Sequence, residues 1–167
     1  MVELKAKVRD HKFLKRKLSA LGAKYIGTLK QSDLYFKVPE GKLKLREIEG
    51  SAAAELIYYN RENIAGPKSN DAYLLRVQDS KDLSKILKKI LTSVVIVKKV
   101  REIYCYQGTH IHLDAVSKLG DFVEFERPTS KNSKLLENDR QILKQLLHKL
   151  QIAPENLVTL SYSDLLN

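Results

Sequence analysis

Short segments of this chain alternate apolar with charged residues at a period of two. The N-terminal segment reads Val2-Glu3-Leu4-Lys5-Ala6-Lys7-Val8, and the segments Lys42–Arg46 and Val123–Glu126 follow the same rule. Successive side chains of a β-strand point to opposite faces, so this alternation is typical of strands with one apolar and one polar face. The chain is therefore predicted to form a sheet that buries one face and carries dense charge on the other.

Other segments complete an α+β pattern. Helical periodicity with start and stop signals predicts helices from Asp10 to Gly22, from Ser80 to Leu91 and from Lys134 to Leu150. Further strands are predicted at Ser32–Lys37, Glu55–Arg61, Ala72–Val77, Val94–Val97, Val100–Tyr106 and His110–Asp114. Many short antiparallel strands with a few helices indicate an α+β fold. The sequence contains no internal repeat and no linker, so a single domain over residues 1–167 is expected.

Composition narrows the class of partner and the compartment. Lys and Arg number 30 against 20 Asp and Glu, and the net charge of +10 favours an anionic partner. The longest apolar run, Leu91–Val97, is far shorter than the roughly 20 residues of a membrane span. Charges near the N-terminus argue against a signal peptide, and the single Cys105 cannot form an intramolecular disulfide. A cytoplasmic protein with no membrane partner is expected.

The charged faces allow two interpretations. They face solvent in an ordinary sheet, or they face inward across a closed barrel of about eight strands that has helices on its apolar outer faces. In the second case, basic side chains inside the barrel neutralise a polyphosphate, and carboxylates hold divalent cations that bridge its oxygens. The pattern alone leaves both interpretations open.

An ordered set of motifs resembles the CYTH proteins, also called triphosphate tunnel metalloenzymes, and most closely the branch of the class IV adenylyl cyclases. The motifs are Val2-Glu3-Leu4-Lys5, Lys44-Leu45-Arg46, Lys99-Val100-Arg101, Gly120–Glu126 and Ser161–Leu166. This resemblance covers essentially the whole chain. It implies a closed antiparallel β-barrel that forms a tunnel, with helices packed outside.

The resemblance also implies roles for individual residues. Glu3 and Lys5 are the implied catalytic residues, and Tyr162 is implied to close the tunnel. The implied metal ligands are Glu3, Asp114, Glu124 and Glu126. The implied phosphate-binding residues are Lys5, Lys7, Lys44, Arg46, Arg61, Lys68, Lys99 and Arg101.

Met1 and the loop after Pro67 depart from the family's pattern, and two histidines lie close together in the sequence. Met1 stands where the family places the first Glu of its N-terminal motif, which removes one oxygen ligand. The loop after Pro67 lacks the arginine of many members and offers Lys68 or the later Arg76 instead. His110 and His112 alternate with apolar residues, but two histidines are too few for a zinc site, and one of them is expected to line the tunnel.

By resemblance, the protein is an enzyme that uses Mg²⁺ or Mn²⁺ and acts on a nucleoside triphosphate or on an inorganic or organic triphosphate. Conversion of ATP to cyclic AMP and pyrophosphate is the first alternative. The second is hydrolysis of tripolyphosphate or thiamine triphosphate, and the third is binding of a polyphosphate or nucleotide without catalysis. No nucleic-acid partner is expected, because the chain lacks the usual binding motifs. Relatives are often dimers, so a homodimer is one expected assembly.

Overall fold

The structure is a computed structural model that describes residues 1–61, 67–128 and 133–167. The strands are β1 (Val2–Lys7), β2 (Lys24–Phe36), β3 (Lys42–Ile48), β4 (Ala54–Arg61), β5 (Lys68–Val77), β6 (Ser93–Tyr106), β7 (Thr109–Val116) and β8 (Gly120–Arg127). The helices are α1 (His11–Ala20), α2 (Ser80–Ile90), α3 (Ser133–Lys149) and α4 (Tyr162–Leu166), with a 3₁₀ turn at Pro154–Asn156. The predicted α+β class with antiparallel strands is confirmed.

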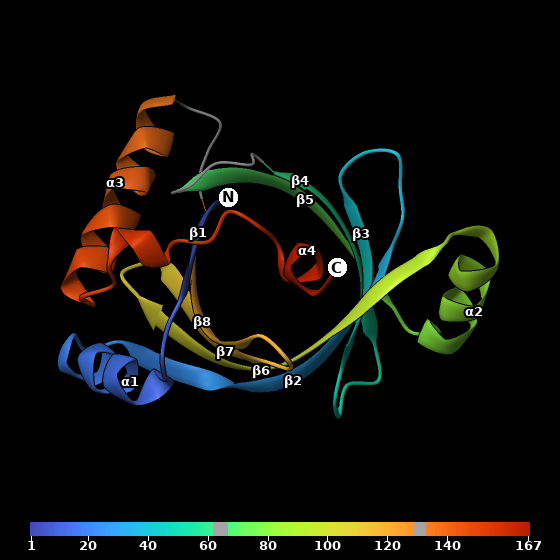
Figure 1. Cartoon of the computed structure of the whole chain (residues 1–167), viewed down its shortest axis with the longest axis horizontal. Coiled ribbons are helices and arrows are strands. Elements are labelled where there is room, and N and C mark those ends of the chain that lie inside the picture. Colours follow the sequence, from blue (N-terminus) through green and yellow to red (C-terminus); the bar gives the residue numbers. More distant parts are fainter. Residues whose placement is uncertain (62–66, 129–132) are drawn as a thin grey trace.

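The eight strands curl into one sheet in the order β1-β5-β4-β3-β2-β6-β7-β8. Strand β1 pairs with β8 from Val2 to Lys7, whereas among the described residues its pairing with β5 is limited to Val2 and Glu3. Beyond that corner the two strands separate (Figure 1). The edge of β1 is instead met by the C-terminal segment, where Val158 donates a backbone hydrogen bond to Lys5. The sheet is thus strongly curled, and its first and fifth strands are hydrogen-bonded to each other at one corner.

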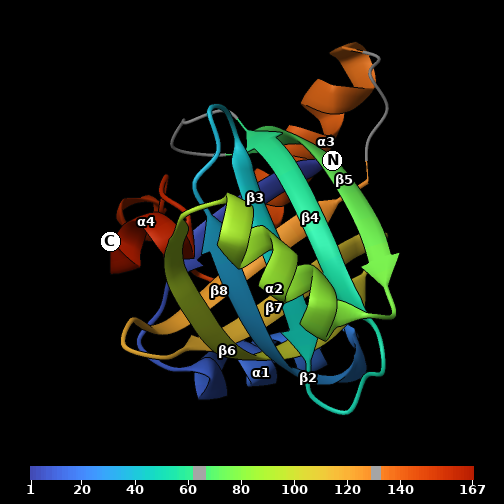
Figure 2. The same ribbon diagram turned by 90° about the vertical axis from the view of Figure 1, so that its right-hand side faces the viewer.

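Helices cover the apolar outer faces of the curled sheet. Val2, Leu4 and Ala6 of β1 belong to a core cluster that includes Leu18 of α1 and Leu143 of α3. A separate cluster places Leu87 of α2 against β3 (Leu45) on the other side of the molecule, as Figures 1 and 2 show. The apolar faces therefore point outward to the helices, and the charged faces point inward. Among the described residues, no helix has the length and apolar character that a membrane crossing demands.

Strands β2 and β6 differ most from the predicted bounds. The sequence pattern suggested separate strands before and after Lys98 and Lys99, whereas β6 is continuous from Ser93 to Tyr106. The alternation holds through this pair, because Lys98 is exposed and Lys99 is buried. Strand β2 begins at Lys24 and not at Ser32, since its first half pairs with β6 along its length.

The hairpin between β2 and β3 depends on Gly41. This residue has a φ of +69°, and a Cβ atom built on it would lie 2.8 Å from both Tyr58 Oη and the Tyr59 carbonyl oxygen. Gly41→Ala is therefore expected to lower the free energy of unfolding by about 2–5 kcal/mol, from backbone strain and overpacking together. Denaturant titration measures the loss. Gly22→Ala is the matched control, since Gly22 has a φ of +75° and open space around it; equal losses in both variants would contradict the contribution of the clash.

Candidate functional site

A cavity of about 190 Å³ lies inside the curl of the sheet. Helix α4 lies across one mouth of the ring of strands (Figures 1 and 2). A capping box between Ser161 and Asp164 starts this helix, and Asp164 also pairs with Lys42 of β3. The charged and hydroxyl-bearing residues that line the cavity are Glu3, Lys5, Tyr35, Lys44, Arg46, Tyr59, Lys99, Arg101, Glu124, Glu126, Ser161 and Tyr162.

Three basic side chains of the cavity converge on Asp33. Its carboxylate accepts hydrogen bonds from Arg46 Nε at 2.7 Å and Nη2 at 2.8 Å, and from Lys44 Nζ at 3.0 Å. Lys99 Nζ lies 3.5 Å away. Burial alone would raise the pKa of Asp33, but the neighbouring cations outweigh it and hold that pKa well below its usual range. Asp33 is therefore an ionised carboxylate that holds three cations around one point.

A second buried network is built on Arg101. Its guanidinium donates to both oxygens of Asp114, at 2.7 and 2.6 Å, and to Glu124 Oε2 at 2.5 Å. Lys5 Nζ approaches the other oxygen of Glu124 at 3.4 Å. Asp114 is fully buried and also accepts a hydrogen bond of 2.9 Å from Tyr162 Oη. These contacts fix the direction of Arg101 and join β6, β7, β8 and α4 at one wall of the cavity.

Next to this network, His112, Glu124 and Glu126 form a group with metal-ligating atoms. One ligand atom from each lies within 4.8 Å of the other two. The strand register explains the grouping, because β7 pairs His112 with Glu124 and β1 pairs Glu3 with Glu126. Burial, followed by the charge of Glu124, raises the pKa of Glu126 to about 7. The group can accept a divalent cation, since carboxylate and imidazole are common ligands of such ions.

The ring of Tyr162 contacts two of the lysines that line the inner cavity. The Nζ atoms of Lys5 and Lys99 lie 4.0 and 5.4 Å from the centre of the Tyr162 ring. Burial, opposed in part by Asp33, lowers the pKa of Lys99 to about 7, so this amine changes its charge near neutral pH. Tyr35 and Tyr59 contact each other through their hydroxyls at 3.4 Å and complete the wall near Lys44.

Most residues with predicted roles meet at this cavity. Glu3, Lys5, Lys44, Arg46, Lys99, Arg101, Glu124, Glu126 and Tyr162 line it, and Asp114 lies directly behind Arg101. Lys7 is exposed and is not among the lining residues. The side chains of Arg61 and Lys68 lie outside the part of the chain that the structure describes.

Sequence reasoning missed Asp33 and set His112 aside. Asp33 alternates with Gln31 and Tyr35 on β2, so a polar inward face was readable there, but nothing in the pattern distinguished this carboxylate. His112 is only 5% exposed, whereas His110 lies at the exposed end of the same face. The prediction that one of the two histidines lies inside is consistent with this arrangement.

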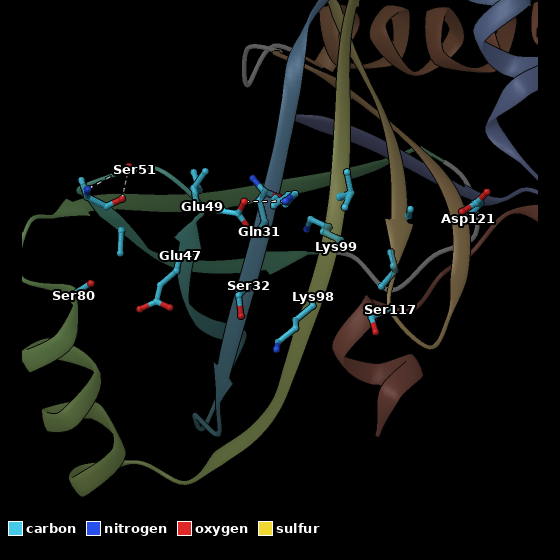
Figure 3. A pocket seen from close by; sticks show the side chains of 17 residues that line it. Gln31, Ser32, Glu47, Glu49, Ser51, Ser80, Lys98, Lys99, Ser117 and Asp121 are labelled. Atoms are coloured by element: carbon cyan, nitrogen blue, oxygen red, sulfur yellow. Dashed lines mark hydrogen bonds and ion pairs between the residues drawn. The ribbon is translucent and has the colours of Figure 1, made fainter.

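A larger hollow of about 790 Å³ is lined by residues of β2, β3, β6 and β7 and by nearby turns (Figure 3). Its lining includes the buried Gln31 and Lys99, so it reaches the inward face of the sheet. Lys98 and Glu47 are exposed there, and the ion pair of Lys30 with Glu49 is exposed too. Exposed charges are well screened by water, and Lys99 is shared with the inner cavity, so this hollow offers fewer buried cations to a strongly charged ligand than the inner cavity does.

The CYTH domain matches residues 1–162. The chain belongs to the CYTH family. A Methanocaldococcus jannaschii protein named "Putative adenylate cyclase" is 28% identical to it, over 98% of this chain and 97% of that protein. The structure of a Pyrococcus horikoshii protein superposes with a TM-score of 0.90 at 27% identity and covers 99% of both chains. A Hippeastrum protein, "Putative adenylyl cyclase HpAC1", shares the fold, with a TM-score of 0.64, 16% identity, and 90% and 88% of the two chains covered.

Met1 is the residue at which this chain departs from the family's N-terminal motif. Met1 lines the inner cavity near Glu3, in the place of the first Glu of the family's N-terminal motif. A thioether is a poor ligand for a hard cation. Met1 therefore adds no hard oxygen ligand to the carboxylates of Glu3, Glu124 and Glu126, which line the same cavity.

Proposed function

We propose that this CYTH protein binds a metal–triphosphate complex in the inner cavity and catalyses a reaction at one of its phosphorus atoms. The observation that carries the proposal is the convergence of buried charges from six strands on one cavity. The basic members are Lys5, Lys44, Arg46, Lys99 and Arg101, and the acidic members are Glu3, Asp33, Asp114, Glu124 and Glu126. Burying so many charges is unfavourable unless they are paired or bind a ligand.

The balance of these charges couples the metal to the triphosphate. Five basic and five acidic side chains nearly neutralise each other around the cavity. A divalent cation held by Glu3, Glu124 and Glu126 would make the site positive, and the site would then attract a polyanion. Because such coupling is reciprocal, each ligand should bind more tightly in the presence of the other.

The residues fit distinct roles in this reaction. Lys44, Arg46 and Lys99 form the phosphate-binding wall, and Lys5 is placed to contact an oxygen of the reacting phosphate. Asp114 uses its oxygens on Arg101 and Tyr162, so we assign it to positioning Arg101 and not to metal binding. A bound divalent cation supplies positive charge to the phosphate oxygens as the P–O bond breaks. Tyr162 and α4 restrict access of bulk water at one mouth.

Hydrolysis of a short triphosphate is the activity that the geometry supports best. Water attacks the terminal phosphorus, and orthophosphate and the shortened phosphate chain leave. Among the described residues that line the cavity there is no Asn or Gln to read the edge of a base, whereas five basic side chains serve phosphates. The Hippeastrum protein of the same fold is described as having a dominant triphosphatase activity.

ATP cyclisation is the second candidate, which the name of the Methanocaldococcus relative favours. In that reaction the ribose 3′-oxygen attacks the α-phosphorus, and pyrophosphate leaves. The phosphate contacts are shared by both routes, and only the nucleophile differs.

One assay panel separates these functions. The purified protein is incubated with Mg²⁺ or Mn²⁺ and with tripolyphosphate, thiamine triphosphate or ATP. Orthophosphate from tripolyphosphate or thiamine triphosphate supports the hydrolase, and cyclic AMP from ATP supports the cyclase. Metal-dependent binding of all three without turnover indicates a polyphosphate or nucleotide binder and contradicts the catalytic part of the proposal.

The ionisation of Lys99 gives a pH-dependent prediction. The Lys99 pKa of about 7 leaves this amine mostly neutral at pH 8, and a bound phosphate favours its charged form. Tripolyphosphate binding at pH 8 should therefore take up close to one more proton in the wild type than in Lys99→Met. Calorimetric titrations in buffers of different ionisation enthalpy measure the proton uptake of each protein. Subtracting the uptake of Lys99→Met from that of the wild type removes the protons that the ligand itself exchanges. Lys98→Met, at the exposed neighbouring position, should match the wild type; a loss of uptake in both variants, or in neither, would refute the assignment.

The remaining expectations stay proposals. We propose that residues 1–167 act as one unit, that the C-terminal segment completes a tunnel where β1 and β5 separate, and that the protein works in the cytoplasm without nucleic acid or membrane. The homodimer is tested by light scattering during gel filtration. A nucleic-acid partner is tested by competition between tripolyphosphate and an oligonucleotide.

A further inference from the structure

The inward faces of three adjacent strands bring a nitrogen ligand to the acidic side of the inner cavity. The register places His112 of β7 beside Glu124 of β8, and Glu126 of β8 beside Glu3 of β1. Ligand atoms of His112, Glu124 and Glu126 lie within 4.8 Å of one another. Ligands of one ion at about 2.0–2.2 Å lie at most about 4.4 Å apart, so small side-chain adjustments suffice to bring all three onto one ion.

The imidazole of His112 carries an independent sign of a ligand. Its side chain is 7% exposed, and its Nδ1 atom is buried without a hydrogen-bond partner among the described residues. A buried polar atom of this kind normally has a partner. The nearest carboxylate oxygen, Glu126 Oε1, lies 3.9 Å from Nδ1, which is too far for a hydrogen bond and suits two ligands of a shared ion.

The Nδ1 atom of His112, unpartnered within the described part of the chain, suits coordination. In the tautomer that carries the proton on Nε2, Nδ1 offers a lone pair to an ion. Glu124 also keeps coordination capacity, because Arg101 occupies Oε2 while Oε1 has only Lys5 at 3.4 Å.

We propose that Nδ1 of His112 is a ligand of the divalent ion in this cavity and makes the site prefer a transition-metal ion such as Mn²⁺ or Co²⁺ over Mg²⁺. Mg²⁺ favours a shell of oxygen ligands and releases its waters reluctantly, whereas first-row transition-metal ions accept an imidazole ligand, with an affinity that rises from Mn²⁺ to Co²⁺. The inference deepens the proposed function and rests on it for the metal's place in the reaction. The nitrogen ligand itself is a property of metal binding alone.

The test uses Mn²⁺ without any triphosphate. Pulsed electron paramagnetic resonance of substoichiometric Mn²⁺ should show coupling to an imidazole ¹⁴N nucleus in the wild type. His112→Asn should abolish this coupling and weaken Mn²⁺ binding roughly 10–100-fold, while Mg²⁺ binding changes less than about threefold. His110→Asn, at the exposed position two residues away, should keep both the coupling and the affinity.

Several results would overturn the inference. They are a wild-type spectrum without nitrogen coupling, coupling that persists in His112→Asn, or equal losses of Mn²⁺ and Mg²⁺ affinity in a folded variant. Should His112→Asn fail to fold, replacing each of the other three histidines in turn still assigns the coupling by elimination. Nitrogen coupling without any turnover of triphosphate would refute the proposed reaction and leave the metal site intact.

Discussion

Replacement of Glu124 with glutamine is expected to lower metal-dependent turnover of tripolyphosphate by roughly 10²–10³-fold. Glu124 is the carboxylate that Arg101, Lys5 and the candidate metal group share. Glutamine keeps the shape and one hydrogen-bond acceptor but removes the negative charge that a cation needs. Arg101 retains both of its hydrogen bonds to Asp114, so the fold should survive.

The experiment compares orthophosphate release with Mn²⁺ present, and thermal unfolding by circular dichroism, for Glu124→Gln and Glu47→Gln. Glu47 is exposed on the outer face of β3 and serves as the matched control. Loss of turnover only in Glu124→Gln, with both variants folded, supports the site. Unchanged turnover would remove Glu124 from it.

Replacement of Asp33 with asparagine should destabilise the protein by about 3–5 kcal/mol, because buried cations lose the charge that pairs with them. Asp33 is 1% exposed and contacts Lys44, Arg46 and Lys99. Its lowered pKa means that this contribution is present at neutral pH and disappears only as strong acid protonates the folded protein. Asp82→Asn, in an exposed pair with Lys85, should change stability by no more than about 1 kcal/mol.

The same variant tests where phosphate binds. If the three cations form the phosphate-binding wall, tripolyphosphate replaces the missing negative charge of Asp33→Asn. Tripolyphosphate should then raise the unfolding temperature of Asp33→Asn more than that of the wild type, since a ligand stabilises the state that it binds. An equal or smaller rise, measured at the same ligand concentration, would show that the polyanion binds elsewhere.

The sequence was most informative where the alternation was regular. The apolar residues of β1 turned outward to the helices as expected, since Val2, Leu4 and Ala6 had no other way to be buried. Asp10, where the first helix was predicted to begin, is its N-cap and accepts a hydrogen bond from the Lys12 amide at 2.8 Å. These features depend on local periodicity and capping, which a single sequence displays directly.

Features that depend on strand register were not readable. Asp33 matters because β2 places it opposite Arg46 of β3, and no local pattern encodes that pairing. His112 was set aside for want of partners, and its partners came from β8 through the pairing of His112 with Glu124. The corner at Val2 and Glu3 where β1 meets β5 likewise reflects the curvature of the whole sheet.

A crystal structure with Mn²⁺ and tripolyphosphate tests the central claim most directly. The account predicts an anomalous manganese peak beside Glu124 and Glu126, with phosphate density running from it toward Lys44, Arg46 and Lys99. Polyphosphate bound instead in the larger hollow, between Lys30 and Lys98, with no metal in the inner cavity, would contradict it.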